Sequence, residues 1–408
     1  MILFLSTNDT LGGAAMVTHR LASALRRTGV DARMLVGRKD GDDAWVAQVG
    51  SFRRKLAKVA ERAEIFTSNG FDRADLWKVS TARFGAAVAS HPWVAEADAI
   101  VLGWVNQGFL SLGQLRRICE MKKPVVWWMH DLWCATGICH LPAGCTRYEL
   151  GCGRCPLLHW ERRMGDLSRF VWERKMDIFR SCPIKFLAVS RWQREQCLKG
   201  SLLRGMDIEV LGHAFPVEEF TTEPAEGSDC GKLRIVMGAA RLDDPVKGLP
   251  VAIEALNLLA QEHPELAARS EAVLFGGLAD ENAFEALRFP FRYVGRMAPD
   301  ELRNLYATAT VVLSTSRFET MGATLMEGMA AGATPVTFGV GGQPDIVTHG
   351  ENGYIADYGS AQSVAHCLRL ALESPFPRAE QHAFVASHFS EKVIVTRLLR
   401  IIAAMRGE

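Results

Sequence analysis

Short apolar runs recur along the whole chain, with longer amphipathic stretches between them. The runs have the length of buried strands, and the stretches between them have helical spacing. Alternation of this kind predicts parallel βαβ units and doubly wound sheets that are covered on both faces. The predicted strands are 2–6, 32–36, 99–102, 125–129 and 186–189 in the first half, and 233–237, 272–275, 292–294, 310–313 and 335–338 in the second.

The series of strands breaks once, at residues 216–231, which are polar, acidic and rich in Pro, Gly and Ser. This composition is typical of an interdomain linker. We therefore expect an α/β protein with two Rossmann-like domains, over 1–215 and 216–383, that face each other across a cleft. Residues 384–408 form a separate segment with a helical pattern.

Composition narrows the class of protein. The chain has 408 residues, of which 48% are hydrophobic and 23% charged, as in soluble globular proteins. A net charge of +1 provides no general field for nucleic acid, so we expect no nucleic-acid partner. The sequence has no signal-like start and no run of membrane-spanning length, and we expect a cytoplasmic chain.

Two carboxylates lie eight positions apart in the segment 314–336, between two predicted strands. Glu319 falls in the loop after the first strand, and Glu327 falls in the helix that follows. Ligands of open parallel sheets bind at this edge, where backbone N–H groups of the helix start face an anion. Alternatively, Glu319 is a helix-start acid near the dipole, and Glu327 is a solvated helix residue.

Together with 341–347 and 350–354, this segment resembles the E-x7-E motif of the retaining glycosyltransferases of family 4, which have the GT-B fold. The resemblance implies that Glu327 accepts hydrogen bonds from ribose hydroxyls, and Glu319 from the transferred sugar. It also implies that the last segment, 384–408, is a helix that packs back on the first domain. Backbone amides would face the sugar and the phosphate near Thr320, Met321, Gly322 and Ala323.

Two cations follow the first strand of the second half, six positions apart. Arg241 and Lys247 would stabilise a leaving diphosphate, Arg241 through paired hydrogen bonds and Lys247 as a point charge. The alternative is that both are solvated loop residues. The pattern resembles the diphosphate clamp of the family, which needs no metal for catalysis, and Arg296 and Met297 lie where the family places the nucleobase.

Candidate acceptor-side residues lie in the first half. Gly12 and Gly13 resemble the first glycine-rich loop of the family, although a tight turn explains them equally well. His130 directly follows a predicted strand and would bond the transferring sugar or the acceptor, with Asp131 orienting it, unless it is a structural residue. The family often has other residues at Gly103 and His213, and these departures put the identity of the acceptor in doubt.

The segment 134–156 is a cysteine-rich insert. The order of residues over 125–156, which includes this insert, resembles a subgroup of family 4 that builds bacterial exopolysaccharide, of the colanic acid WcaC type. The insert holds either a structural zinc ion or reduced packing cysteines, because only its last pair has the usual ligand spacing. The candidate ligands are Cys139, Cys145, Cys152 and Cys155.

One further segment, 52–66, places an apolar stripe beside a basic face. Phe52, Leu56, Val59, Ala63 and Phe66 share this stripe. Such a helix either contacts the inner face of a membrane or faces the protein core with a solvated basic side.

These patterns together predict a retaining glycosyltransferase. It would move a sugar from a nucleoside diphosphate donor to a glycan or a lipid-linked oligosaccharide in bacterial surface polysaccharide biosynthesis. A sugar-nucleotide-binding assembly protein without activity, and an epimerase or phosphorylase on the same fold, are the alternatives.

Overall fold

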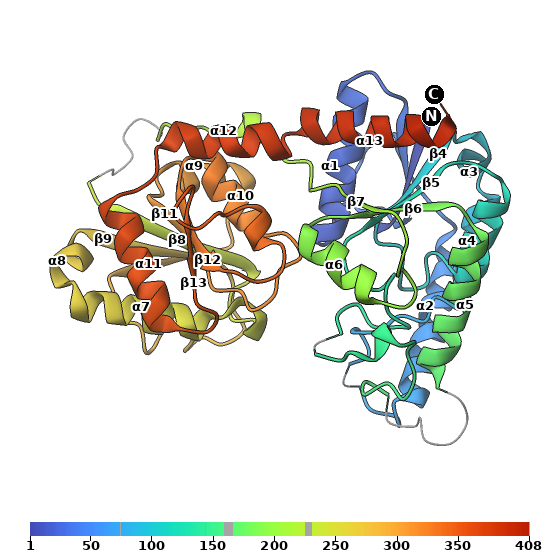
Figure 1. Ribbon diagram of the computed structural model, residues 1–408, viewed down its shortest axis with the longest axis horizontal. Coiled ribbons are helices and arrows are strands. Elements are labelled where there is room, and N and C mark those ends of the chain that lie inside the picture. The colour runs from blue at the N-terminus through green and yellow to red at the C-terminus, as the bar shows by residue number, and fades with distance from the viewer. Residues whose placement is uncertain (74, 143, 159–165, 225–230, 408) are drawn as a thin grey trace. The chain divides into compact units, whose positions relative to one another are not determined.

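The computed structural model describes residues 1–407 except 74, 143, 159–165 and 225–230. The chain divides into two compact units. The first unit comprises Met1–Ala214 and Ile394–Glu408, and the second comprises Phe215–Val393. Each unit is a parallel sheet with helices on both faces (Figure 1). The prediction of two Rossmann-like, doubly wound domains is confirmed.

The first unit contains a seven-stranded sheet in the order β3-β2-β1-β4-β5-β6-β7. Its strands are β1 (Ile2–Asn8), β2 (Ala32–Arg38), β3 (Val46–Gln48), β4 (Ala99–Leu102), β5 (Val125–Met129), β6 (Ile184–Ala188) and β7 (Ile208–Val210). Its helices are α1 (Gly13–Arg27), α2 (Ser51–Ser68), α3 (Pro92–Glu96), α4 (Leu112–Glu120), α5 (Leu167–Ser181) and α6 (Arg191–Lys199).

Strand β1 shows why this sheet is covered on both sides. Leu3 and Leu5 join one apolar cluster, whereas Ile2 and Phe4 join another cluster on the opposite face. Side chains alternate between the two faces of a strand, so a fully apolar run must have packing partners on both. These apolar clusters fix the sheet whose edge carries the candidate site residues.

The second unit contains a six-stranded sheet in the order β10-β9-β8-β11-β12-β13. Its strands are β8 (Leu233–Arg241), β9 (Ser270–Gly277), β10 (Phe291–Gly295), β11 (Val311–Ser314), β12 (Thr334–Phe338) and β13 (Tyr354–Ala356). Its helices are α7 (Leu249–Glu262), α8 (Pro264–Ala268), α9 (Pro299–Ala307), α10 (Ala323–Ala330), α11 (Ala361–Glu373) and α12 (Arg378–Phe389).

The end of the chain differs from the single helical segment expected from residue 384. Helix α12 ends at Phe389, and a separate helix, α13 (Glu391–Arg406), follows after Ser390. Residues of α13 from Ile394 onward belong to the first unit, where Ile394, Leu398 and Ile402 are buried in the cluster that contains α1 side chains. The start of the predicted linker 216–231 is not a loose connection between domains. Val217, and Phe215 just before the linker, are buried in the core of the second unit. Residues 225–230 of that linker lie outside the described residues.

Candidate functional site

The strand order of the second sheet reverses between β8 and β11. From β8 the chain runs outward to β9 and β10, and it then returns to the other side of β8 to form β11. The loops after these two neighbouring strands therefore diverge, and a ligand-binding crevice forms at such a reversal. Lys247 lies in the loop after β8, and Glu319 lies in the loop after β11.

Lys247 and Glu319 form an ion pair across this reversal, with the ammonium nitrogen Nζ 2.6 Å from the carboxylate oxygen Oε1. Both side chains are partly exposed, at 30% and 23%. Neither charge is buried, so both remain available to a ligand that enters from solvent. From the sequence, Lys247 was expected at the diphosphate and Glu319 at the transferred sugar. In the structure the two side chains are in direct contact.

The backbone around Lys247 is held by the neighbouring loop. The Thr315 hydroxyl donates to the carbonyl oxygens of Lys247 and Gly248, each at 3.1 Å. Gly248 has a φ of 69°, and a Cβ atom there would meet the carbonyl oxygen of Thr315 at 2.1 Å. Only glycine allows this approach. The Lys247 loop is thereby fixed to the end of β11.

The backbone of Glu319 is held in a similar way. The Gly342 amide donates to the carbonyl oxygen of Glu319 at 3.0 Å. Gly341 has a φ of 61°, and an added Cβ atom would lie 1.8 Å from the same oxygen. The glycine pair after β12 therefore sets the position of the carboxylate in the neighbouring loop.

Glu327 lies on α10, and the Tyr306 hydroxyl of α9 donates to its Oε2 atom at 3.1 Å. Burial, followed by the Glu327 charge, raises the pKa of Tyr306 well above its ordinary value. The phenol therefore stays protonated and keeps its donor role. Helix α10 begins after Gly322, whose φ is 111°. Thr320 is partly exposed and Ala323 is exposed, whereas Met321 points into the core.

Arg241 ends β8 and is 57% exposed, with Nε 3.2 Å from Oδ1 of Asp243. Asp243 also accepts bonds from the amides of Ala279 and Asp280, and these bonds lower its pKa. Arg241 is thus tied to the loop after β9. Arg296 is exposed, with its guanidinium over Gly277, and Met297 packs against the core. The candidate donor residues therefore all follow carboxyl ends of strands in one sheet or lie on α10.

The first unit presents different chemistry at the carboxyl ends of its strands. His130 follows β5 and His213 follows β7, with ring centroids 5.8 Å apart and both rings against Trp128. Nδ1 of His130 and both ring nitrogens of His213 are buried and have no hydrogen-bond partner within the described residues. Burial lowers the pKa of His130 to about 4 and that of His213 to about 3. Both rings are therefore neutral hydrogen-bonding groups.

Neighbouring strands add unpaired polar atoms at the same edge. Oγ of Ser6 on β1 and Nδ2 of Asn106 after β4 are also buried without a partner in the part of the chain that the structure describes. Nε2 of His130 lies 3.2 Å from the Thr18 hydroxyl of α1. The Thr18 side chain also packs closely against Gly103, where a Cβ atom would lie 2.7 Å from its hydroxyl oxygen. Gly12 and Gly13 are exposed at the start of α1. Unpaired buried polar atoms are costly, and their concentration at one edge favours a ligand with hydroxyl groups.

Asp131 does not bond His130. Its Oδ2 atom lies 2.6 Å from Nδ1 of His140, and Nε2 of that ring lies 3.0 Å from the Ser80 hydroxyl. Asp131 also accepts a bond from the Trp104 indole at 2.8 Å. The order Ser-His-Asp is that of a hydrolase triad. Ser80 has no exposed surface, however, so this chain of bonds connects loops and offers no nucleophile to a substrate.

All four predicted zinc ligands line one small cavity: Cys139, Cys145, Cys152 and Cys155. The Gly137 amide donates to the Cys152 sulfur at 3.0 Å, and burial raises the pKa of the Cys139 thiol to about 12. Among the described residues, no three or more Cys, His, Asp or Glu side chains are grouped so as to hold a metal ion. The zinc site stays a prediction.

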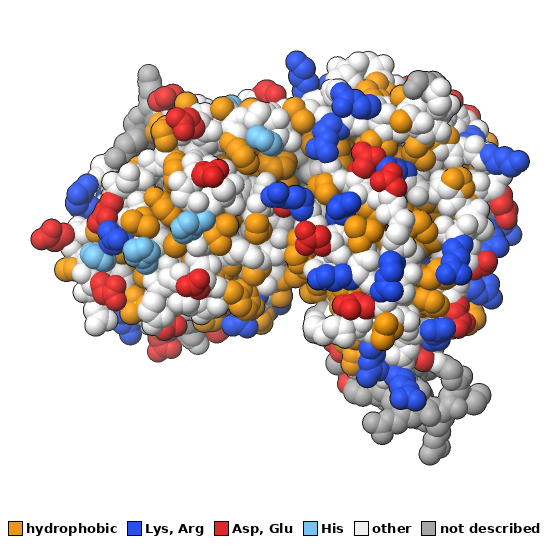
Figure 2. Space-filling view, viewed as in Figure 1, with side chains coloured by type: hydrophobic (Ala, Val, Ile, Leu, Met, Phe, Trp, Pro, Cys, Tyr) orange, Lys and Arg blue, Asp and Glu red, His pale blue; other side chains and the backbone are white. Residues whose placement is uncertain are grey.

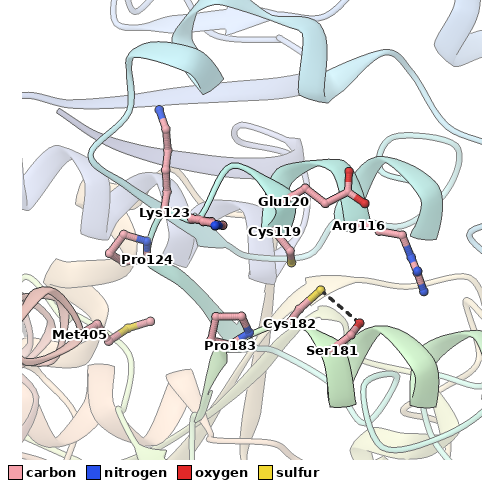
Figure 3. Close-up of a pocket in the computed structure, with 10 residues that line it drawn as sticks. Arg116, Cys119, Glu120, Lys123, Pro124, Ser181, Cys182, Pro183 and Met405 are labelled. Atoms are coloured by element: carbon pink, nitrogen blue, oxygen red, sulfur yellow. Dashed lines mark hydrogen bonds between the residues drawn. The ribbon is translucent and has the colours of Figure 1, made fainter.

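A larger cavity of about 620 Å³ lies in the first unit near the start of β5 and β6. It is lined by α4, the end of α5 and Met405 of α13, and Cys119 and Cys182 lie close together in it (Figure 3). This is the amino edge of the sheet, opposite the candidate residues. Figure 2 shows both Lys and Arg and Asp and Glu side chains on the visible face.

Comparison with known proteins finds similarity to glycosyltransferases in the second half of the chain. Residues 234–374 match the family model described as glycosyl transferases group 1. The chain is 29% identical over 170 residues to a glycogen synthase of Mycobacterium tuberculosis. This match covers 40% of this chain and 41% of that protein. The chain is 28% identical over 134 residues to a D-inositol 3-phosphate glycosyltransferase of Acidothermus cellulolyticus, 30% of each chain. The matches therefore span less than half of these relatives.

Solved structures resemble the whole chain. HepE of Anabaena in complex with UDP-glucose has a TM-score of 0.64 at 18% identity, over 99% of both chains. WaaG, a glycosyltransferase involved in lipopolysaccharide biosynthesis, has a TM-score of 0.60 at 16% identity, over 98% of this chain and 99% of that one. At these identities the likeness shows the fold, which is the GT-B fold.

Sequence reasoning missed several residues that build these edges. Thr315 lies two positions after the predicted strand 310–313, and that position was the available signal for its role. Tyr306 carries no such signal, because its bond to Glu327 depends on how α9 packs beside α10. Ser6 and Asn106 are likewise recognised only once β1 and β4 are seen as neighbours.

Proposed function

We propose that this protein is a glycosyltransferase that moves a sugar from a nucleoside diphosphate donor to a hydroxyl of a glycan or lipid-linked acceptor. The observation that carries the proposal is the ion pair of Lys247 and Glu319 at the strand-order reversal of the second sheet. A nucleotide sugar offers a diphosphate to the ammonium group and sugar hydroxyls to the carboxylate. The family match of residues 234–374 and the UDP-glucose bound by HepE support this class of donor.

In the proposed reaction, the bond between the anomeric carbon and the diphosphate oxygen breaks. An acceptor hydroxyl attacks on the face that the diphosphate leaves, and the leaving phosphate takes its proton, so the anomeric configuration is retained. Lys247 and Arg241 stabilise the negative charge on the leaving group. Glu319 and Glu327 hold hydroxyls of the sugar and the ribose.

The proposed setting is bacterial surface polysaccharide biosynthesis, which the resemblance of the segment 125–156 to the exopolysaccharide subgroup of family 4 supports. An assembly protein that binds a sugar nucleotide without transferring it would need the same donor residues. An epimerase would release free sugar without an acceptor.

One experiment separates these functions. The protein is incubated with a panel of UDP-, GDP- and dTDP-sugars, and thermal stabilisation identifies the donor. At a hundred times the dissociation constant, a bound donor stabilises by about 2.7 kcal/mol. The identified donor, labelled in its sugar, is then supplied with lipid and polysaccharide extracts. Acceptor-dependent incorporation of label supports the transferase, and binding without release of nucleoside diphosphate contradicts it.

A further inference from the structure

Helix α2 exposes a large apolar stripe to solvent, although Ala57 and Ile65 of the same helix are buried. Its apolar residues Phe52, Leu56 and Val59 are 78%, 60% and 65% exposed, whereas Arg54 and Glu61 are buried. The alternative from the sequence, that this stripe faces the core, is therefore wrong. Five large exposed apolar residues define what we call the α2 surface: Phe52, Leu56, Val59, Phe71 and Trp77.

The acidic side chains of α2 are turned toward the protein. The Glu61 carboxylate has no exposed surface and accepts hydrogen bonds from the Thr81 and Ala82 amides, each at 2.9 Å. Glu64 accepts a bond from the Thr81 hydroxyl and pairs with Arg83. These bonds satisfy the buried carboxylate, and together with the buried side chains of Ala57 and Ile65 they fix the rotation of the helix.

The cations of α2 lie beside the exposed stripe. Arg53 and Lys55 are exposed. Lys58 and Arg62 lie over the Trp77 ring, 5.2 Å and 5.1 Å from its centroid. Burial, and then the nearby charges of Arg54, Arg62 and Arg38, lower the pKa of Lys58, although Glu61 opposes them. The solvent side of α2 therefore combines apolar side chains with positive charge.

We propose that the α2 surface docks on an anionic lipid bilayer. Helices that lie in the membrane interface combine exposed aromatic and aliphatic side chains with flanking Lys and Arg, and they bind through apolar burial and attraction to anionic lipids. An exposed apolar patch of this size is unfavourable in water and is typical of a surface that binds a membrane or another molecule. None of the described helices is long and apolar enough to cross a bilayer, so α2 would lie on the surface.

The test is cosedimentation of the full chain with vesicles of phosphatidylcholine, with and without phosphatidylglycerol. The wild-type chain binds the anionic vesicles, and added salt weakens this binding. The triple variant Phe52→Ser, Leu56→Ser, Val59→Ser loses at least about tenfold in affinity. Arg53→Gln and Lys55→Gln each lose about fivefold. The control Tyr358→Ser removes an apolar side chain that is 61% exposed in the second unit, and it binds like the wild type.

Two outcomes overturn the proposal. One is a triple variant that binds anionic vesicles as tightly as the wild type. The other is a lipid-free wild-type chain that self-associates through this surface, so that the triple variant becomes monomeric in sedimentation velocity. The proposal does not rest on the proposed function, because vesicle binding is measured without donor. Thermal stabilisation by the donor stays unchanged in all α2 variants.

Discussion

The carboxyl edges of the two sheets carry opposite kinds of polar chemistry. In the second unit, charged residues lie against partners of opposite sign: Lys247 with Glu319, and Arg241 with Asp243. In the first unit, the edge carries the neutral rings of His130 and His213. Nδ1 of His130 and both ring nitrogens of His213 are buried without a partner among the described residues. The same fold thus builds one edge of ion pairs, which suits a charged ligand, and another of neutral hydrogen-bonding groups, which suits an uncharged one.

This difference has a physical cause. Charged side chains remain partly exposed because they need water or a counter-charge. The diphosphate of an anionic donor would take the place of both for Lys247 and Arg241. Neutral imidazoles tolerate burial, and they need only hydroxyl groups to complete their hydrogen bonds. Under the proposed function, the charged edge would bind the diphosphate and sugar of the donor, and the neutral edge would bind hydroxyls of a sugar or acceptor.

The largest expected effect follows from removing the charge at the second edge. Lys247→Ala lowers the rate of sugar transfer by about 10² to 10³, because the leaving diphosphate loses a fixed positive partner. Glu319→Gln lowers it as well, and the double variant loses less than the sum of the two free energies, since the residues form one pair. Steady-state kinetics measure all three.

The control for this series is Lys232→Ala, which removes an exposed lysine of the same unit outside the site. It transfers sugar at the wild-type rate. Circular dichroism confirms that each variant is folded. An unimpaired Lys247→Ala enzyme would contradict the role of the charged edge.

A second effect concerns the backbone contact that places Glu319. Gly341→Ala and Gly350→Ala both put a side chain at positive φ, 61° and 77°, and each loses about 1 kcal/mol of stability for that reason. Only Gly341 lacks room, because its Cβ atom would lie 1.8 Å from the Glu319 carbonyl oxygen, whereas nothing lies within 4 Å at Gly350. Urea unfolding therefore shows a loss of more than about 3 kcal/mol for Gly341→Ala. Equal losses in the two variants would exclude this contact.

The charged edge was more accessible to sequence reasoning than the neutral one. Arg241 ends an apolar strand, and Lys247 and Glu319 lie in loops after apolar strands, so their place at a sheet edge could be predicted. His213 follows β7, which has only three residues, and no periodicity marks so short a strand. The orientation of α2 could not be predicted either, because bonds from the Thr81 and Ala82 amides to Glu61 decide it. Local patterns thus predict the elements, but contacts between distant segments decide their orientation.

The third prediction concerns pH and the neutral edge. Histidines with an ordinary pKa of 6.5 bind protons in the unfolded chain, while His130 and His213 in the folded chain stay neutral until about pH 4 and 3. Acid therefore favours the unfolded state, and stability falls as pH drops below 6.5. Between pH 6.5 and 5 the loss from this pair is about 3 kcal/mol. The double variant His130→Phe, His213→Phe shows a smaller decrease in urea unfolding, and an unchanged decrease would contradict neutral burial.

The smallest expected effect tests what the neutral edge binds. His213→Phe removes both ring nitrogens and retains an aromatic side chain, and it raises the KM for the acceptor about threefold to tenfold while kcat changes less. His213→Asn restores one donor and one acceptor, and it recovers most of this loss. Because both histidines stay neutral above pH 5, the KM shows no titration near pH 6.5. A KM that titrates there, or an equal loss in the Asn and Phe variants, would mean that His213 acts through packing against Trp128 alone.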